Sequence, residues 1–228
     1  MPDQPRELKV ILFGATGMIG SGVLQSCLED AAVAAVLVIG RSSCGRSHPK
    51  LQEILHPDFY DYSAIQGRLS GYNACLFTLG VSAVGMKEEA YAHITYDLTL
   101  AAASAVLAAN PGCSFAYVSG QGTDSSEKGR IMWARVKGRI ENKLLAMPFQ
   151  PATMFRPGGI QPMQGVASKT RLYRIMYLLM GPFMPLMVKY MPAAMTTSER
   201  LGRAMLAAAR GQAGKKILES RDINLLGA

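Results

Sequence analysis

The stretch KVILFGATGMIG, residues 9–20, decides the fold. Its first half is an apolar, β-branched run that ends on glycine, which is typical of a buried strand. Three glycines with the spacing GxxGxxG follow, and the next apolar positions repeat with the period of a helix. In a strand–loop–helix unit, such glycines permit a tight turn, a close approach of phosphate to the backbone, and packing of the helix on the sheet. The loop therefore predicts a dinucleotide phosphate site at the positive end of a helix dipole, held by Gly14, Thr16, Gly17, Met18, Ile19 and Gly20. The alternative is a glycine-rich turn without a ligand.

Beyond this unit, the chain alternates between short apolar runs and longer helical patterns. Strands are expected at 33–41, 51–55, 73–80, 113–120 and 152–159, and helices at 17–29, 87–109 and 126–146. These intervals are too long for hairpins, so they require right-handed crossovers between parallel strands. The sequence therefore predicts an α/β fold, a doubly wound parallel sheet of the Rossmann type with a small helical C-terminal region.

The character of the chain changes after residue 160, and we expect residues 161–228 to form a lid on the substrate side of the same domain. The segment 171–192 is rich in Met and Pro, and its uncharged part, 175–188, is too short to span a bilayer. It is expected to cover a substrate pocket, a partner surface or a membrane surface. Thr196 and Glu199 predict a capping box for a helix that ends near Arg210, and 215–220 predicts a last strand.

Charge divides the chain into two unlike halves. The 228 residues include 24 Lys or Arg and 16 Asp or Glu, and residues 128–228 alone hold 17 basic and 4 acidic side chains. A basic half indicates an anionic partner, such as a membrane surface or an acidic substrate, or else a solvated face. Aromatic and basic residues do not alternate in the pattern typical of RNA-recognition proteins, so nucleic acid is not expected as a partner. The four cysteines form no metal-binding pair and no secretory signal is recognisable, so we expect reduced thiols and a cytoplasmic location.

The end of the second predicted strand indicates which dinucleotide binds. NAD sites usually carry Asp or Glu there, and this carboxylate accepts a hydrogen bond from the ribose 2′-hydroxyl. This chain has Arg41 followed by Ser42, and a guanidinium binds a 2′-phosphate that a carboxylate would repel. We therefore expect NADP(H) rather than NAD(H), bound by residues 1–160 as an NADP-binding domain. The alternative is that Arg41 is a surface residue at a strand end.

Several motifs together resemble a known family. The family is the atypical short-chain dehydrogenases/reductases, and the motifs are GATGMIG, the Asp58-Phe59 pair, FTLG, YVSG and the helix with Lys137. Within that family, SGQGTDSSEKGRIMWARVKGRIENKLL followed by MFRPGGIQP is similar to the Tat-interacting-protein oxidoreductase branch. The resemblance covers residues 8–162. It implies adenine contacts from Asp58 and Phe59, and a nicotinamide-ribose contact from Lys137. The other coenzyme contacts expected from it are Thr78, Leu79, Gly80, Ser119, Arg156, Pro157 and Gly158.

The catalytic pattern of that family is incomplete in this chain. Those enzymes use a Tyr four residues before the Lys and a Ser or Thr at the end of the fifth strand, and here these positions hold Trp133 and Gly120. An indole N–H does not act as an acid near neutral pH. Lys137 is therefore the catalytic residue that remains. The acids that could substitute for the missing Tyr are Tyr91, Tyr96, Tyr117 and His93, each of which is otherwise a packed aromatic or a surface group.

Two functions stay open. The first is an NADP(H)-dependent reductase, or an epimerase-like enzyme, that acts on a small apolar carbonyl or quinone. The second is a catalytically inactive NADPH-binding regulatory or scaffold protein, with a membrane surface or a second copy of the chain as its partner. The three histidines are scattered, so no metal site is expected.

Overall fold

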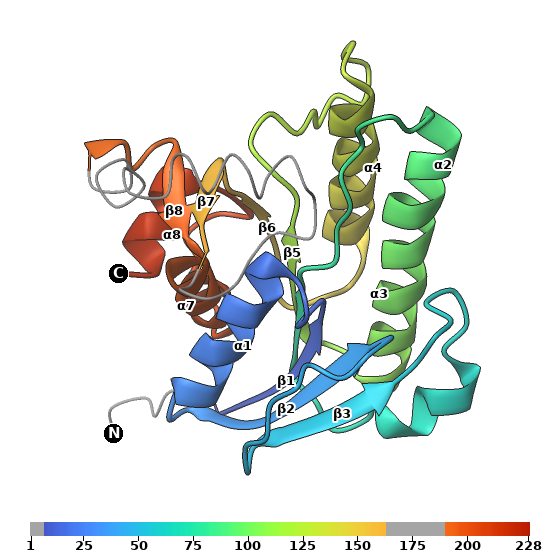
Figure 1. Cartoon of the computed structure of the whole chain (residues 1–228), viewed down its shortest axis with the longest axis vertical. Coiled ribbons are helices and arrows are strands. Elements are labelled where there is room, and N and C mark those ends of the chain that lie inside the picture. The colour runs from blue at the N-terminus through green and yellow to red at the C-terminus, as the bar shows by residue number, and fades with distance from the viewer. Residues whose placement is uncertain (1–6, 163–189) are drawn as a thin grey trace.

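A parallel sheet of seven strands runs through the computed structural model, which describes residues 7–162 and 190–228 (Figure 1). Its strand order is β3-β2-β1-β4-β5-β6-β9, and every neighbouring pair is parallel. The strands are β1 (Leu8–Phe13), β2 (Val33–Gly40), β3 (Leu51–Leu55), β4 (Ala74–Phe77), β5 (Ser114–Val118), β6 (Ala152–Arg156) and β9 (Ile217–Glu219). The order reverses between β1 and β4, and ligands of such sheets bind at that switch point. The predicted doubly wound fold is confirmed.

Helices cover both faces of the sheet (Figure 1). One face carries α1 (Met18–Glu29), α7 (Ser198–Ala209) and α8 (Ser220–Leu226), and the other carries α2 (Glu88–Ala92), α3 (Leu98–Ala109) and α4 (Met132–Ala146). Because side chains alternate along a strand, β1 feeds both core layers. Val10 and Leu12 pack in the cluster that includes α1 and α7, whereas Ile11 and Phe13 pack in the cluster that includes α3 and α4.

The helix expected at 87–109 is one continuous helical run with an irregular turn. A π-helical turn, His93–Asp97, separates α2 from α3. By length and composition alone, this stretch of 22 residues is apolar enough to cross a membrane. In the fold, however, its inner face packs on the sheet, where Ala102, Ala103 and Val106 are almost completely buried. This packing buries one side of the helix, and 28% of its most apolar window, within Glu88–Ala109, is buried in the described structure.

The next helix, α4, begins at Met132 rather than at the expected Ser126. The carboxylate of Asp124 accepts hydrogen bonds from the backbone N–H of Ser126 at 3.0 Å and of Gly129 at 2.6 Å. These bonds hold residues 124–129 as a turn, because an Asp side chain that satisfies nearby amides competes with a helix.

The C-terminal elements differ from the expectation in their detail. The cap of α7 is Thr197, whose hydroxyl accepts a hydrogen bond from the N–H of Arg200, so the capping box predicted at Thr196 is wrong by one residue. The hydroxyl of Thr196 instead donates to Asn224 at 2.8 Å. The last expected strand is confirmed as β9. A second, two-stranded sheet of β7 (Gly159–Gln161) and β8 (Met195–Thr197), and a 3₁₀ helix at Ser63–Arg68, complete the described elements. Most of the predicted lid segment, residues 163–189, lies outside the described residues.

Candidate functional site

The glycine loop connects β1 to α1 at the carboxyl edge of the sheet. Gly14 has φ +89°, a conformation that favours glycine, and the N–H of Gly17 donates to the Gly14 carbonyl at 2.9 Å. A Cβ at Gly20 would lie 2.5 Å from the carbonyl carbon of Gly14 and 2.7 Å from Oγ1 of Thr78. Gly17 caps α1 without any side-chain hydrogen bond. The first amides of the helix therefore have no side-chain acceptor at this cap, as an anion-binding helix start requires.

Thr78 ties the loop to the neighbouring strand. Its hydroxyl donates to the carbonyl of Phe13 at 2.7 Å and so joins the ends of β1 and β4. Thr78, a predicted coenzyme contact, therefore lies at the switch point, although its hydroxyl is already bonded to the backbone.

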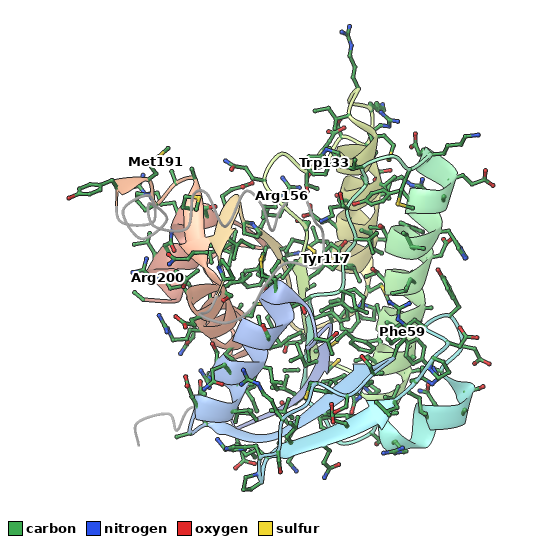
Figure 2. The ribbon with its side chains drawn as sticks, in the orientation of Figure 1. Phe59, Tyr117, Trp133, Arg156, Met191 and Arg200 are labelled. Carbon is green, nitrogen blue, oxygen red and sulfur yellow. The ribbon has the colours of Figure 1, made fainter. Side chains whose placement is uncertain are left out.

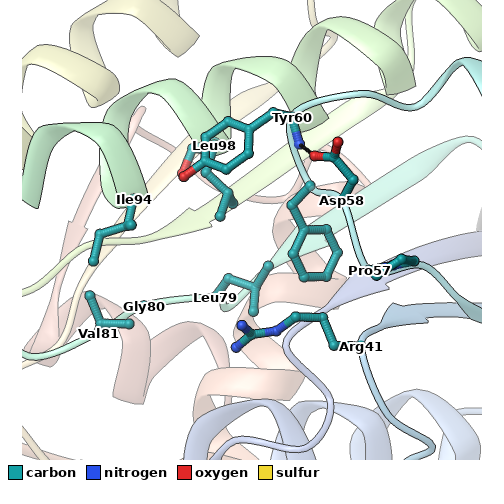
Figure 3. Close-up of a pocket in the computed structure, with 11 residues that line it drawn as sticks. Arg41, Pro57, Asp58, Tyr60, Leu79, Gly80, Val81, Ile94 and Leu98 are labelled. Atoms are coloured by element: carbon teal, nitrogen blue, oxygen red, sulfur yellow. Dashed lines mark hydrogen bonds between the residues drawn. The ribbon is translucent and has the colours of Figure 1, made fainter. Parts of the chain in front are cut away.

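A cavity of about 580 Å³ opens beside this edge of the sheet (Figure 3). Its walls come from the segments that follow β2, β3 and β4 and from the helical run α2–α3: Arg41, Pro57, Asp58, Phe59, Tyr60, Leu79, Gly80, Val81, Ile94, Leu98 and Thr99. The cavity thus brings together five of the predicted coenzyme contacts. Arg41 is exposed, and its guanidinium reaches beneath Leu79 in the view of Figure 3.

Asp58 and Phe59 are held differently within this wall. The Asp58 carboxylate accepts a hydrogen bond from the N–H of Tyr60 at 2.8 Å, which fixes the turn after β3. The Phe59 ring is 5% exposed and packs edge-on against Phe13 at a centroid distance of 6.3 Å. Phe59 therefore belongs to the core and also closes the floor of the cavity.

A second cavity of about 400 Å³ adjoins the first, since Val81 lines both. Its lining is mostly apolar and aromatic: Val81, Ser82, Ala83, Val84, Tyr91, Met132, Trp133 and Lys137. Trp133, in the first turn of α4, lies toward the upper end of that helix in Figure 2. The ammonium of Lys137 is the one cation among the lining residues.

Lys137 donates a hydrogen bond to the main-chain carbonyl of Ser119 at the end of β5. Burial lowers the pKa of Lys137 from 10.5 to about 8, and the charge of Glu141 acts in the opposite direction. Most molecules therefore carry the ammonium below pH 8.

Several predicted contacts lie away from both cavities. The hydroxyl of Ser119 donates to the carboxylate of Glu141, and Nε of Arg156 donates to both oxygens of the same carboxylate at 3.1 Å. The carbonyl of Pro157 accepts a hydrogen bond from the backbone of Gln121 at 2.9 Å, and the N–H of Gly158 donates to Ser220 at 2.8 Å. These residues, together with Ser42, line neither cavity. Their coenzyme contacts stay predictions.

The four candidate acids have different surroundings. Tyr91 lines the second cavity with Lys137, and burial raises its pKa. Tyr117 is buried among the packed side chains (Figure 2), and burial raises its pKa further. Tyr96 lies under the guanidinium of Arg139 at 4.8 Å. His93 is exposed and stacks on Tyr60 at 4.5 Å. Of these four residues, Tyr91 alone faces Lys137 across a cavity.

Sequence reasoning missed Glu141. It is fully buried on α4, four residues after Lys137, and so on the same face of the helix. A carboxylate on the buried face of a helix requires a cation as its partner. The spacing of four residues between Lys137 and Glu141 is the sequence feature that could have indicated this. Among the described residues, no group of three His, Cys, Asp or Glu is arranged to hold a metal ion.

The strand order, the glycine loop and the two cavities at the carboxyl edge define a Rossmann-like α/β fold. Similar solved structures include the Bordetella bronchiseptica enzyme WbmF in complex with NAD⁺, with TM-score 0.69 and 14% identity, covering 98% of this chain and 78% of that one. A short chain dehydrogenase from Burkholderia cenocepacia in complex with NADP has TM-score 0.66 and 15% identity, covering 95% and 89%. The structural neighbours are thus of the short-chain dehydrogenase type.

Among curated proteins, one similar sequence is the leucinostatins biosynthesis cluster protein T of Purpureocillium lilacinum, 30% identical over 169 residues, 71% of this chain and 61% of that protein. Another is protein FMP52, mitochondrial, of Chaetomium globosum, 26% identical over 152 residues, 64% of each chain. This chain therefore spans less than two thirds of the length of these relatives. No protein-family model matches the sequence.

The names of the relatives correct one expectation. Several FMP52 and fmp52 proteins similar to this chain are named mitochondrial. The prediction of a cytoplasmic location, which was based on cysteine usage and on the N-terminal sequence, is therefore wrong. Cysteine usage does not distinguish the cytoplasm from an organelle with a reducing interior.

Proposed function

We propose that the chain binds NADP(H) across the carboxyl edge of its sheet and reduces a small apolar carbonyl or quinone. The observation that carries this proposal is the pair of adjoining cavities beside the switch point, one next to Arg41 and Asp58 and the other next to Lys137. The glycine loop fits a diphosphate, because Gly17 caps α1 and leaves the first amides of the helix without a side-chain acceptor.

The first cavity fits the adenosine half of the coenzyme. Its walls are mostly apolar apart from Thr99 and the turn at Asp58, and its edge carries Arg41. An arginine at this position favours the 2′-phosphate of NADP(H), because the paired charges form short, strong hydrogen bonds. Of the two solved neighbours, one holds NAD⁺ and the other NADP. Our proposal of NADP(H) over NAD(H) therefore rests on Arg41.

The second cavity fits the nicotinamide end and the substrate. When bound, the coenzyme supplies a hydride to the carbonyl carbon. The residues of this chain would hold the substrate between Trp133 and the valines, exclude water, and place the Lys137 ammonium near the ribose. The hydroxyl of Tyr91 would donate the proton to the carbonyl oxygen. Burial raises the pKa of this phenol, and its hydrogen bond with Thr95 acts in the opposite direction. The phenol is therefore protonated at neutral pH, but it is a weaker acid than a group whose pKa lies near the working pH.

One experiment tests both binding and chemistry. Calorimetry should show tighter binding of NADPH than of NADH, and purified protein should oxidise NADPH with a panel of quinones, ketones and aldehydes. Tyr91→Phe should reduce the turnover about 10²- to 10⁴-fold with the affinity for NADPH unchanged. Tyr96→Phe is the matched control, since Tyr96 lies on the same helical run but lines neither cavity. Absence of heat with both coenzymes would overturn the proposal.

A second function has a specific observation in its favour. The indole of Trp133 replaces the expected phenol, and the Ser119 hydroxyl is occupied by Glu141. A chain that binds NADPH tightly but turns over none of the carbonyls would be an NADPH-binding regulatory protein.

The finer assignments belong to the same proposal. These are the atypical short-chain class and its Tat-interacting-protein branch. Of the region 161–228 that was expected to form a lid, residues 190–228 pack in the core beside α1 and in the main sheet, and they line neither cavity. From the names of the FMP52 relatives we propose the mitochondrion as the location. Contact with a membrane surface or with a second copy of the chain stays a prediction.

A further inference from the structure

A buried ion pair lies behind the lysine of the second cavity. Glu141 is 0% exposed, and the guanidinium of Arg156 forms a bidentate pair with its carboxylate. Arg156 also donates to the hydroxyl of Ser125 at 2.5 Å and lies 3.8 Å from Glu219. The pair thus connects α4 to the end of β6 and to β9 on the far side of β6.

Ser119 connects this ion pair to Lys137. Its hydroxyl donates to Glu141, with the Phe155 carbonyl as a second acceptor at 3.1 Å. Its carbonyl accepts from the Lys137 ammonium, and its N–H donates to the carbonyl of Phe155 at 2.8 Å. All three polar groups of this residue are therefore engaged, two of them with side chains of α4. The end of β5 cannot rotate without breaking one of these bonds.

We propose that Glu141 is a positioning residue for Lys137: by binding the Ser119 hydroxyl, its carboxylate holds the Ser119 carbonyl toward the lysine ammonium. A buried ion pair is costly to desolvate, and apolar residues in its place are often no less stable. Holding Lys137 in place is a role that apolar residues could not fill. That Lys137 contacts coenzyme rests on the proposed function, whereas its positioning by Glu141 does not.

The electrostatic consequence follows from the same geometry. The titratable or charged groups around Lys137 are Glu141 on α4 and Tyr91 on α2. Those around the Glu141–Arg156 pair are Tyr117 on β5, Glu219 on β9 and Asp124 in the turn before α4. Burial lowers the pKa of Lys137, and Glu141 is the charge that raises it. Glu141 therefore favours the protonated lysine as well as holding the carbonyl that it binds.

The test measures the titration of Lys137 in the coenzyme-free chain. Competitive labelling with acetic anhydride across pH, with mass spectrometry of the Lys137 peptide, should give a midpoint of about 8 in the wild type. Glu141→Gln should lower that midpoint by about one pH unit, because a neighbouring opposite charge is lost. Ser114→Ala is the matched control: this buried serine lies at the other end of β5 and bonds the carbonyl of Asn73 at 3.3 Å. The Lys137 midpoint in the Ser114→Ala variant should equal that of the wild type.

Because Glu141→Gln leaves a buried guanidinium without its partner, the double variant Glu141→Gln/Arg156→Met provides a second test that avoids this. It should melt close to the wild type and still show the lowered Lys137 midpoint. A wild-type midpoint in a folded variant would overturn the positioning role and leave Glu141 purely structural. Coenzyme binding is measured on the wild type, because Arg156 is itself a predicted coenzyme contact. A lowered Lys137 midpoint in the variants, together with a wild-type protein that binds neither NADPH nor NADH, would support the positioning role and overturn the proposed function.

Discussion

The replacement of Gly20 by alanine is the perturbation that most directly tests the glycine loop. The added Cβ would lie 2.5 Å from the Gly14 carbonyl carbon and 2.7 Å from Oγ1 of Thr78, whereas carbon atoms in contact are about 3.5–4.0 Å apart. Because the nearest obstacle is backbone, the loop itself must move by about 1 Å. Overpacking of this kind costs about 1–3 kcal/mol, which lowers the melting temperature of a chain of this size by about 2–12 °C.

The affinity for coenzyme should fall with the stability. The displaced amides would lose charge-assisted hydrogen bonds to the diphosphate, each of about 1.5–3 kcal/mol, so we expect at least a tenfold rise in the Kd of NADPH. Gly17→Ala should lower the melting temperature less than Gly20→Ala, since its Cβ would lie 3.2 Å from the Gly14 oxygen. Gly67→Ala, whose Cβ would meet nothing within 4 Å, is the control. Differential scanning calorimetry and isothermal titration give both quantities. If Gly20→Ala melts and binds as Gly67→Ala does, the reasoning is refuted.

Three further changes test the site and the core. Arg41→Asp should weaken NADPH by about 10- to 100-fold with little effect on NADH, because a charge-assisted bond to the 2′-phosphate is lost; equal weakening in fluorescence titrations would contradict this. The free energy of unfolding of the wild type, relative to that of Lys137→Met, should rise between pH 8 and about 10.5, because the unfolded lysine keeps a proton that the folded one has lost. Urea unfolding across pH measures this difference, and an opposite slope would contradict the lowered pKa of Lys137. Asn110→Ala should cost about 2 kcal/mol in the same assay, since this buried side chain bonds the carbonyl of Leu69 at 2.7 Å and the amide of Tyr72 at 3.0 Å; an unchanged midpoint would show that water replaces both bonds.

Much of the sheet could be predicted because its strands are buried on both faces. The runs at 9–14, 33–41, 113–120 and 152–159 are largely apolar, and each contains a strand of the structure. The run 51–55 also forms a strand, but it contains Gln52 and Glu53 and lies partly exposed at the edge of the sheet. The start of α4 could not be predicted, because the residues after Asp124 have no apolar pattern that separates a turn from a helix. The pairing of β7 with β8 was equally hidden, since it joins segments from both sides of residues 163–189.

The first cavity of the candidate site could be predicted, because its lining residues include sequence motifs at the ends of strands. Arg41, Asp58 and Leu79 follow three different strands, and parallel strands bring their carboxyl ends to one edge. The environment of Ser119 was not predictable. Its partner Glu141 is distant in sequence, and an isolated Glu on a helix is usually a solvated residue. The match of a buried carboxylate to a buried guanidinium becomes visible only when β6 and α4 are packed together.

The position of β9 has a consequence for synthesis of the protein. Met154 of β6 is the register partner of Ile217, so the outer edge of β6 gains its neighbour only from a late part of the chain. On the ribosome, the preceding strands and their helices emerge first, and β6 waits with unpaired backbone groups along that edge. An open edge next to a nearly complete apolar sheet favours association with other chains. The edge of β6 therefore stays open to other chains from the emergence of residue 156 until that of residue 219.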